Sequence, residues 1–408
     1  MGQPIIESNT LLNANIGFLR THLAIVHLPS SAYPLFLQPI LSLLLHNKLR
    51  DEDGAVIPPH RPWNYWHPFV NVSITPNECS IVCPREEAEA LFQPLLSSLS
   101  PALRKQVSIS REDYSVITID GEGLEAGQRV LDLTSPLALA GIPIFFITSY
   151  YSDFILVPYS TRSNVIHALE ERGFVFEADS EDGEAGHMTN PASPLLNSHA
   201  RQGSSSSSSD GSGFGSSSIP VAPHTPPPTT ISDLQTRTFK ILARNNVSPH
   251  VDPTIELITC AGLKDSTPGS SESNFTEGKL QIGIAKCLTA FPAPRFFSVT
   301  LTDTESLSLT LEKRLLTNFP NGGEDILLGT QAPEQIPITL DLQDLPLEST
   351  GIVCGVSRRL TEGMKGRMGR EMFNMSYLST SRAGHVIVYE DELEDAMEAL
   401  SGGGAAAG

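Results

Sequence analysis

The side chains that could do chemistry are scattered along this chain. Cys79 and Cys83 lie four residues apart in a strand-like stretch, which would place both thiols on one face of a sheet. A metal site would need further Cys or His ligands at suitable spacing, so we interpret the pair as small buried hydrophobes. The other cysteines are Cys260, Cys287 and Cys354. An odd, scattered set is typical of free thiols in a reducing compartment, and we expect a cytoplasmic protein.

Carboxylates and glycines near residue 120 do not form a catalytic pattern. Asp113, Asp120 and Glu122 lie near a strand end, but no residue orients two of them as a general acid and base. Gly121 and Gly123 lack the third glycine that a phosphate-binding loop needs. The sequence contains no nucleophile elbow, P-loop or zincin motif. We therefore expect a protein that is not an enzyme and that holds no cofactor and no metal.

An aromatic segment, HRPWNYWHPF at residues 60–69, could provide a stacking platform or two metal-binding histidines. We interpret it instead as a loop that caps a hydrophobic core, because large aromatic side chains dominate burial where they occur.

The overall charge narrows the range of partners. The formal net charge is −19, which argues against nucleic acid or an anionic membrane as the main partner. A membrane-spanning helix needs roughly 18–20 consecutive apolar residues. Leu35–Leu45 is the nearest candidate, and Gln38, Pro39 and Ser42 interrupt it. A chain of 408 residues is expected to form roughly two to four domains.

The chain repeats itself weakly across a Ser/Gly/Pro-rich segment. Phe69–Glu78 (FVNVSITPNE) matches Phe296–Glu305 (FFSVTLTDTE) at an offset of 227 residues (296 − 69). Pro143–Val157 (PIFFITSYYSDFILV) matches Asn374–Val388 (NMSYLSTSRAGHVIV) at an offset of 231 residues (374 − 143). Two matches at nearly one offset predict a duplication. The junction between two copies also favours a ligand pocket.

Hydrophobic periodicity predicts β-α-β-β-α-β units, the ferredoxin-like order, with two units in each half. In the first half, strands are expected at Thr21–His27, Phe69–Ile74, Cys79–Cys83, Tyr114–Asp120, Pro143–Thr148, Phe154–Val157 and Phe174–Phe176, and helices at Tyr33–Leu45, Arg85–Leu99, Gly127–Leu139 and Arg162–Arg172. In the second half, strands are expected at Thr254–Cys260, Phe296–Leu301, Leu307–Leu311, Ile336–Leu342, Met372–Leu378 and His385–Val388, and helices at Glu312–Phe319, Gly351–Leu360 and Glu390–Leu400.

The predicted fold class is therefore α+β, with four ferredoxin-like units in two tandem halves joined by a disordered linker. The expected units span 21–110, 111–177, 233–330 and 331–400. Between and around them we expect a loose N-terminus at 1–20, the linker at 178–232, an internal loop at 262–278 and a disordered tail at 401–408.

Five segments together resemble the CASTOR family, cytosolic arginine sensors of the TOR growth-control pathway that contain four ACT domains. They are FVNVSITPNECSIVCPREEAEALF (69–92), ITSYYSDFILV (147–157), VIHALEE (165–171), DLPLESTGIV (344–353) and SYLSTSRAGHVIVYED (376–391). The resemblance implies ferredoxin-like ACT modules that bind an amino acid at their mutual interfaces. It implies a non-enzymatic sensor that signals through a partner protein and can form a homodimer. The alternative is an interaction scaffold that kept the fold and lost the ligand site.

By the same resemblance, the amino acid lies between the second and fourth units. Its expected contacts are Pro143, Ile144, Glu348, Ser349, Thr350, Gly351, Thr380, Ser381, Ala383 and Gly384. A helix beginning after Gly351 would offer free N–H groups to a carboxylate. In the arginine sensors the last turn carries an Asp that reads the guanidinium, whereas Gly384 stands here. Because a buried cation without a carboxylate is costly, we expect a neutral or acidic amino acid.

The resemblance also implies a partner surface around the hairpin of the second unit. The family contacts a large GATOR regulatory complex there, and the matching residues are Tyr150, Tyr151 and Asp153. A second interpretation of Asp153 is a hairpin-turn residue, since Asp favours turns.

Overall fold

The computed structural model describes residues 15–19, 21–45, 63–120, 126–172, 175–178, 185–189, 228, 230–263, 271–346, 349–368 and 375–401. In the first half the strands are β1 (Asn15–Phe18), β2 (Leu23–Pro29), β3 (Phe69–Ile74), β4 (Glu78–Pro84), β5 (Ser108–Ile109), β6 (Tyr114–Asp120), β7 (Phe145–Thr148), β8 (Asp153–Pro158), β9 (Val175–Ala178) and β10 (Ala185–Thr189). The α-helices are α1 (Leu37–Leu45), α2 (Arg85–Leu91), α3 (Gln93–Leu96), α4 (Pro101–Arg104), α5 (Ala126–Leu139) and α6 (Arg162–Glu170), and 3₁₀ turns occupy Ser30–Phe36, Trp63–Trp66 and Tyr159–Thr161.

The second half repeats this alternation with its own variations. Its strands are β11 (Pro249–Val251), β12 (Leu257–Gly262), β13 (Phe297–Thr302), β14 (Ser308–Glu312), β15 (Leu327–Leu328), β16 (Gln335–Asp341), β17 (Ser376–Ser379) and β18 (Ala383–Tyr389). Its α-helices are α7 (Ile231–Arg244), α8 (Ser271–Leu288), α9 (Ile352–Met368) and α10 (Leu393–Ser401), and 3₁₀ turns occupy Lys313–Asn318, Pro320–Gly323 and Glu390–Glu392.

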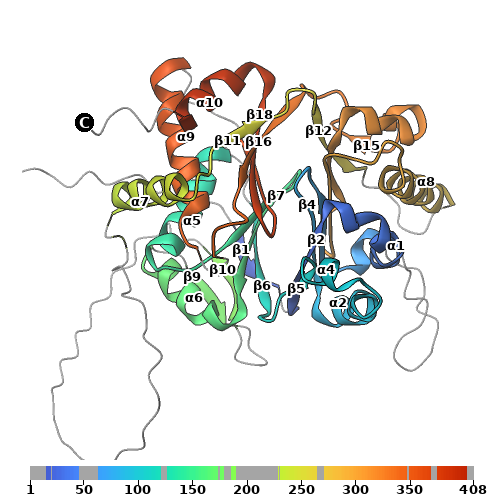
Figure 1. Ribbon diagram of the computed structural model, residues 1–408, viewed down its shortest axis with the longest axis horizontal. Helices are drawn as coiled ribbons and strands as arrows, with labels where there is room; N and C mark the ends of the chain where they lie inside the picture. Colours follow the sequence, from blue (N-terminus) through green and yellow to red (C-terminus); the bar gives the residue numbers. More distant parts are fainter. Residues whose placement is uncertain are drawn as a thin grey trace, which may run out of the picture.

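The strands of the described residues form one antiparallel hydrogen-bonded network that divides into two runs. One run has the order β5-β2-β4-β3-β13-β14-β12-β15. The other has the order β9-β10-β1-β6-β8-β7-β17-β18-β16-β11. The strands lie in the middle of the molecule, with α5, α6, α7, α9 and α10 on one side and α1, α2 and α8 on the other (Figure 1).

Residue pairing across the two halves follows the sequence repeat. Val72 of β3 pairs with Val299 of β13, and Ile147 of β7 pairs with Leu378 of β17. These are the residues that the offsets of 227 and 231 equate, so each junction lies on a pseudo-two-fold axis. Hydrogen bonds around the second junction are reciprocal. The Phe146 N–H donates to Ser379 Oγ at 2.9 Å, and its counterpart, the Tyr377 N–H, donates to Thr148 Oγ1 at 3.0 Å.

The outer strands depart from the expected order in a symmetric way. β1 precedes the first predicted unit yet pairs with β6, and β11 precedes β12 yet pairs with β16. β9, which overlaps the expected strand Phe174–Phe176, pairs with β10 and not with β6. An open strand edge presents unpaired N–H and C=O groups, and β1 and β11 satisfy them. Strands of three or four residues are too short to show periodicity, so the sequence indicated a loose start at 1–20.

Three further expectations differ from the structure. Residues 271–278 of the expected loop belong to α8, which buries Leu280, Ile284 and Leu288 in the core. The run SSESN at 270–274 is polar and gives no apolar periodicity, so the sequence does not reveal the start of the helix. The helix expected at Glu312–Phe319 is a 3₁₀ turn at Lys313–Asn318. β10 falls within the expected linker, and residues 190–227 lie outside the described residues.

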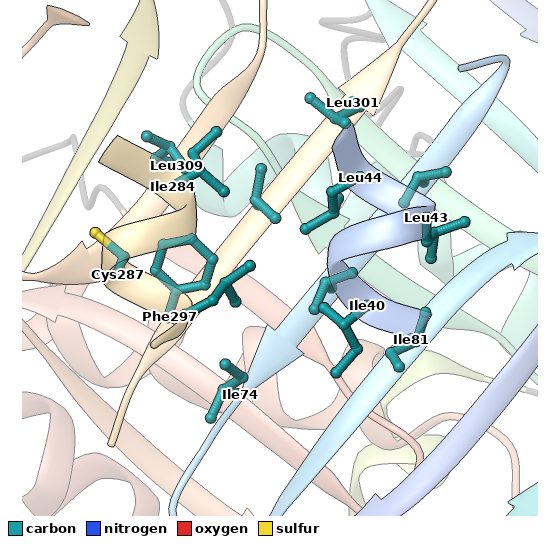
Figure 2. Packing of buried hydrophobic residues seen from close by; sticks show 14 of the residues in the cluster. Ile40, Leu43, Leu44, Ile74, Ile81, Ile284, Cys287, Phe297, Leu301 and Leu309 are labelled. Atoms are coloured by element: carbon teal, nitrogen blue, oxygen red, sulfur yellow. The ribbon is translucent and has the colours of Figure 1, made fainter. Parts of the chain in front are cut away.

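Three large hydrophobic clusters and one small one, of Ala138, Leu234 and Cys354, fill the spaces between these layers in the described residues. Figure 2 shows the first, where Ile40, Leu43 and Leu44 of α1 pack near strand residues such as Ile81 and Leu301. The second lies under α5, α6 and α9. The third joins residues of both strand runs, including Phe69 and Phe154, whose rings meet edge to face at 5.1 Å between centroids. Each fully buried Phe of this kind contributes roughly 1.5–3 kcal/mol.

Two sequence interpretations are confirmed by burial. Cys79 and Cys83 are buried in the first cluster as unpaired thiols, and burial raises the pKa of both. Trp63 from the aromatic segment is also in this cluster, and its indole N–H donates to the Leu44 carbonyl at 2.5 Å. His60 lies outside the described residues. In the part of the chain that the structure describes, no helix is long and apolar enough to cross a bilayer.

Candidate functional site

A cavity of about 60 Å³ lies where the N-terminus of α9 meets β7 and the turn between β17 and β18. Six of the predicted contact residues line it: Ile144, Ser349, Gly351, Thr380, Ser381 and Ala383. Pro143, Thr350 and Gly384 are neighbours of these residues in the chain, but they do not line the cavity. Glu348 lies outside the described residues. The structure thus brings together residues as much as 239 positions apart in the chain (383 − 144).

The N-terminus of α9 supplies the polar end of the cavity. Gly351 has a φ of +80°, which favours glycine, and a Cβ at that position would come within 3.2 Å of Leu234. The first carbonyl to accept a helical hydrogen bond is that of Gly351, from the Gly355 N–H at 2.8 Å. The N–H groups of Ile352 and Val353 therefore have no partner within the helix, and both residues line the cavity. The helix dipole adds partial positive charge there.

Tyr377 lines the opposite wall of the cavity, and Gly384 lies directly behind it. A Cβ on Gly384 would lie 2.5 Å from the Tyr377 hydroxyl oxygen, so the tyrosine occupies the space of any side chain at position 384. Tyr377 is only 1% exposed, and burial raises the pKa of its hydroxyl, which keeps the proton available for donation. Among the described residues nothing hydrogen-bonds to this hydroxyl. It is the polar group that sequence analysis missed.

The turn between β17 and β18 is closed on itself and fixed to the neighbouring wall. The Thr380 N–H donates to the Ala383 carbonyl at 2.9 Å, and the Thr380 hydroxyl donates to the same carbonyl at 3.1 Å. The Leu342 N–H donates to the Arg382 carbonyl at 2.7 Å. Leu342, Leu345 and Pro346 complete the cavity wall on that side. The cavity is therefore bounded by backbone that is held in place by hydrogen bonds.

The chemistry of this lining is neutral and amphipathic. The cavity combines apolar side chains with hydroxyls and helix N–H groups, and among the described residues no charged side chain lines it. Such a site can hold a small molecule with a carboxylate at the helix end, but its described residues offer no acid and base pair for catalysis. No group of three or more His, Cys, Asp or Glu residues is placed to hold a metal ion in the described ranges.

The predicted partner surface is only partly exposed. Asp153 is 0% exposed, and its carboxylate is paired with the Arg129 guanidinium. Burial raises the pKa of the Asp153 carboxyl, although Arg129 opposes the shift. Asp153 is the first residue of β8, and its side chain belongs to a buried ion pair. A partner protein could therefore not contact this side chain. Tyr150 lies against the position of Gly329, and Tyr151 is 45% exposed.

Comparison with known proteins identifies the domain class of one segment of the chain. A family model described as an ACT domain matches residues 109–171, which include β6, α5, β7 and β8. ACT domains generally bind amino acids in regulatory roles. A search of curated proteins gave no match.

Solved structures give distant likenesses. An aspartate kinase from Synechocystis is 12% identical over 94% of this chain and 54% of its own, with a TM-score of 0.29, so this chain spans about half that enzyme. The ligand-free regulatory subunit of aspartate kinase from Thermus thermophilus is 13% identical over 40% of this chain and 97% of its own, with a TM-score of 0.25. A protein from Agrobacterium tumefaciens is 19% identical over 39% and 87%, with a TM-score of 0.24. TM-scores this low support no conclusion about function.

Proposed function

We propose that this chain is a non-enzymatic, amino-acid-binding regulator of the CASTOR type. The chain would contain four ACT units, arranged in two tandem halves, and the ligand would bind at the α9 cavity between the second and fourth units. The observation that carries this proposal is the meeting of six predicted contact residues around the free N–H groups of α9. Signal output would pass through a partner protein of TOR-type nutrient control, reached through the exposed Tyr151. Five buried, unpaired thiols suit a cytoplasmic location.

The lining favours a small neutral amino acid as the ligand. A cavity of about 60 Å³ is well below the roughly 300 Å³ of a typical ligand pocket. An arginine side chain would need both more volume and a carboxylate partner for its guanidinium. The ligand carboxylate would accept hydrogen bonds from the Ile352 and Val353 N–H groups, and the Tyr377 hydroxyl would donate to its polar atoms.

A thermal-shift screen against the proteinogenic amino acids tests this proposal. A ligand that binds only the folded state raises the melting temperature, by an amount that grows with its concentration. We expect a rise with small neutral amino acids such as alanine, serine or valine and none with arginine. No rise with any amino acid would overturn the sensor and favour the alternative, an interaction scaffold. The small volume of the cavity is the observation that favours this alternative.

A further inference from the structure

The turn between β17 and β18, which we call the cavity turn, is held on its outer side by residues of the first half of the chain. The Arg382 N–H donates to Glu78 Oε1 at 2.6 Å. The Ser381 N–H donates to Ser80 Oγ at 3.2 Å, and the two serine hydroxyl oxygens lie 3.0 Å apart. We call these four residues the first clamp. Glu78 is only 1% exposed, and both serines are buried, so these hydrogen bonds are shielded from water.

A second clamp related by the pseudo-two-fold repeats this contact elsewhere. The Tyr150 N–H donates to Ser308 Oγ at 2.9 Å, and the Ser152 hydroxyl donates to Glu305. Ser308 faces Thr300 across its hairpin as Ser80 faces Ser73, so the two serines are equivalent. Each clamp therefore joins a hairpin from one half to a turn from the other half, and the halves interlock crosswise.

The first clamp alone is joined to the cavity described above. Ser381 contributes to both, because it lines the cavity and also contacts Ser80. The backbone of Arg382 is held on both sides. Its N–H donates to Glu78, and its carbonyl accepts from the Leu342 N–H. Glu78 is itself fixed, because its other carboxylate oxygen lies 2.5 Å from His27 Nδ1. A displacement of the cavity turn would therefore strain the contact with Glu78 and Ser80.

We infer that Glu78 and Ser80 are positioning residues that set the cavity wall and link ligand binding to the packing of the two halves. The ligand part of this inference rests on the proposed function. A ligand that binds one position of the turn more tightly than another shifts the equilibrium between these positions, by a free energy equal to the difference in its binding free energies. By the same linkage, a change in the clamp that favours one position changes the ligand's binding free energy by an equal amount. Release or tightening of the first clamp would then carry the signal to the opposite half.

Ser80→Ala tests the inference, with Ser308→Ala as its matched control. Each substitution removes one equivalent hydroxyl and leaves one turn N–H without its acceptor. Loss of such a hydrogen bond is expected to speed local amide exchange about tenfold. In Ser80→Ala we expect faster exchange at residues 380–383 and weaker binding of alanine, serine or valine by isothermal titration. In Ser308→Ala we expect faster exchange at residues 149–152 and wild-type binding.

Conservative variants at Glu78 separate positioning from general stability. Glu78→Gln keeps an acceptor oxygen for the Arg382 N–H and should retain slow exchange at that amide, whereas Glu78→Ala should not. Unchanged exchange at 380–383 in Ser80→Ala, or equal affinity loss in Ser80→Ala and Ser308→Ala, would overturn the inference. If the wild-type chain binds no amino acid, the proposed function fails, and the exchange measurements still decide whether Glu78 and Ser80 position the turn.

Discussion

Substitution of Gly384 by Ala gives a sharp test of the wall opposite α9. The added Cβ would lie 2.5 Å from the Tyr377 hydroxyl oxygen, a separation that real side chains do not tolerate. The tyrosine cannot swing away easily, because it is only 1% exposed and its ring packs edge to face near Phe146, with 6.4 Å between centroids. Overpacking of this kind costs about 1–3 kcal/mol. We expect Gly384→Ala to lower the free energy of unfolding by that amount.

Tyr377→Phe should rescue most of this loss. Without the hydroxyl, the nearest atom to the new Cβ is the ring carbon Cζ at 3.3 Å, which needs a shift of only a few tenths of an ångström. Tyr377→Phe alone should cost less than about 1 kcal/mol, because the hydroxyl has no hydrogen-bond partner among the described residues. The two substitutions should therefore couple by about 1–2 kcal/mol in a double-mutant cycle.

Urea unfolding of the four proteins in this cycle measures the coupling directly. If Gly384→Ala costs the same in the wild type as in the Tyr377→Phe variant, the contact between residues 377 and 384 is refuted. The result would also remove the steric reason for a glycine at position 384.

Two further predictions concern buried ionisable groups. Burial lowers the pKa of His385 from 6.5 to about 4. As the pH falls below 6.5, the unfolded chain binds a proton at this histidine that the native chain does not bind. The free energy of unfolding therefore falls as the pH falls. Between pH 7.5 and 5 this loss should be about 2 kcal/mol. Urea unfolding should show a weaker pH dependence of stability in His385→Gln than in the wild type. The same pH dependence in both proteins would contradict the lowered pKa of His385. Asp153→Asn should destabilise the fold by roughly 3 kcal/mol, because it leaves the Arg129 guanidinium buried without its carboxylate. Calorimetry of Asp153→Asn and of Asp153→Asn with Arg129→Met checks this, and the second variant should recover stability; an unchanged melting temperature in the single variant would count against the buried pair.

The sequence predicted the repeat because it depends on local features, whereas the expected contact residues came from the family resemblance. The matched segments are the strands at the pseudo-two-fold junctions, where Val72 meets Val299 and Ile147 meets Leu378. The Gly351 turn is likewise visible as a helix start. The matched segments extend over whole hairpins, and glycine stands at a position that needs it, so the local pattern carries the information.

The rest depended on contacts between distant segments. β1 and β11 are defined by the strand edges they cover, not by their own composition. The burial of Asp153 comes with Arg129 on α5, which no pattern around the hairpin reveals. The sequence pattern around Tyr377 is that of an ordinary strand. Its position in the cavity wall follows only from its packing against Gly384. The crosswise clamps likewise join distant residues, such as Ser80 and Ser381, which are 301 positions apart.

The most direct test of the central claim is a titration that compares two neighbouring substitutions with the wild type. Ser349 and Thr350 are both half-buried, but only Ser349 lines the cavity. We predict that Ser349→Phe fills the cavity and abolishes calorimetric binding of the neutral amino acid that most stabilises the wild type, whereas Thr350→Phe retains it. Binding that survives in Ser349→Phe, with the fold intact by circular dichroism, would contradict a ligand site at the N-terminus of α9.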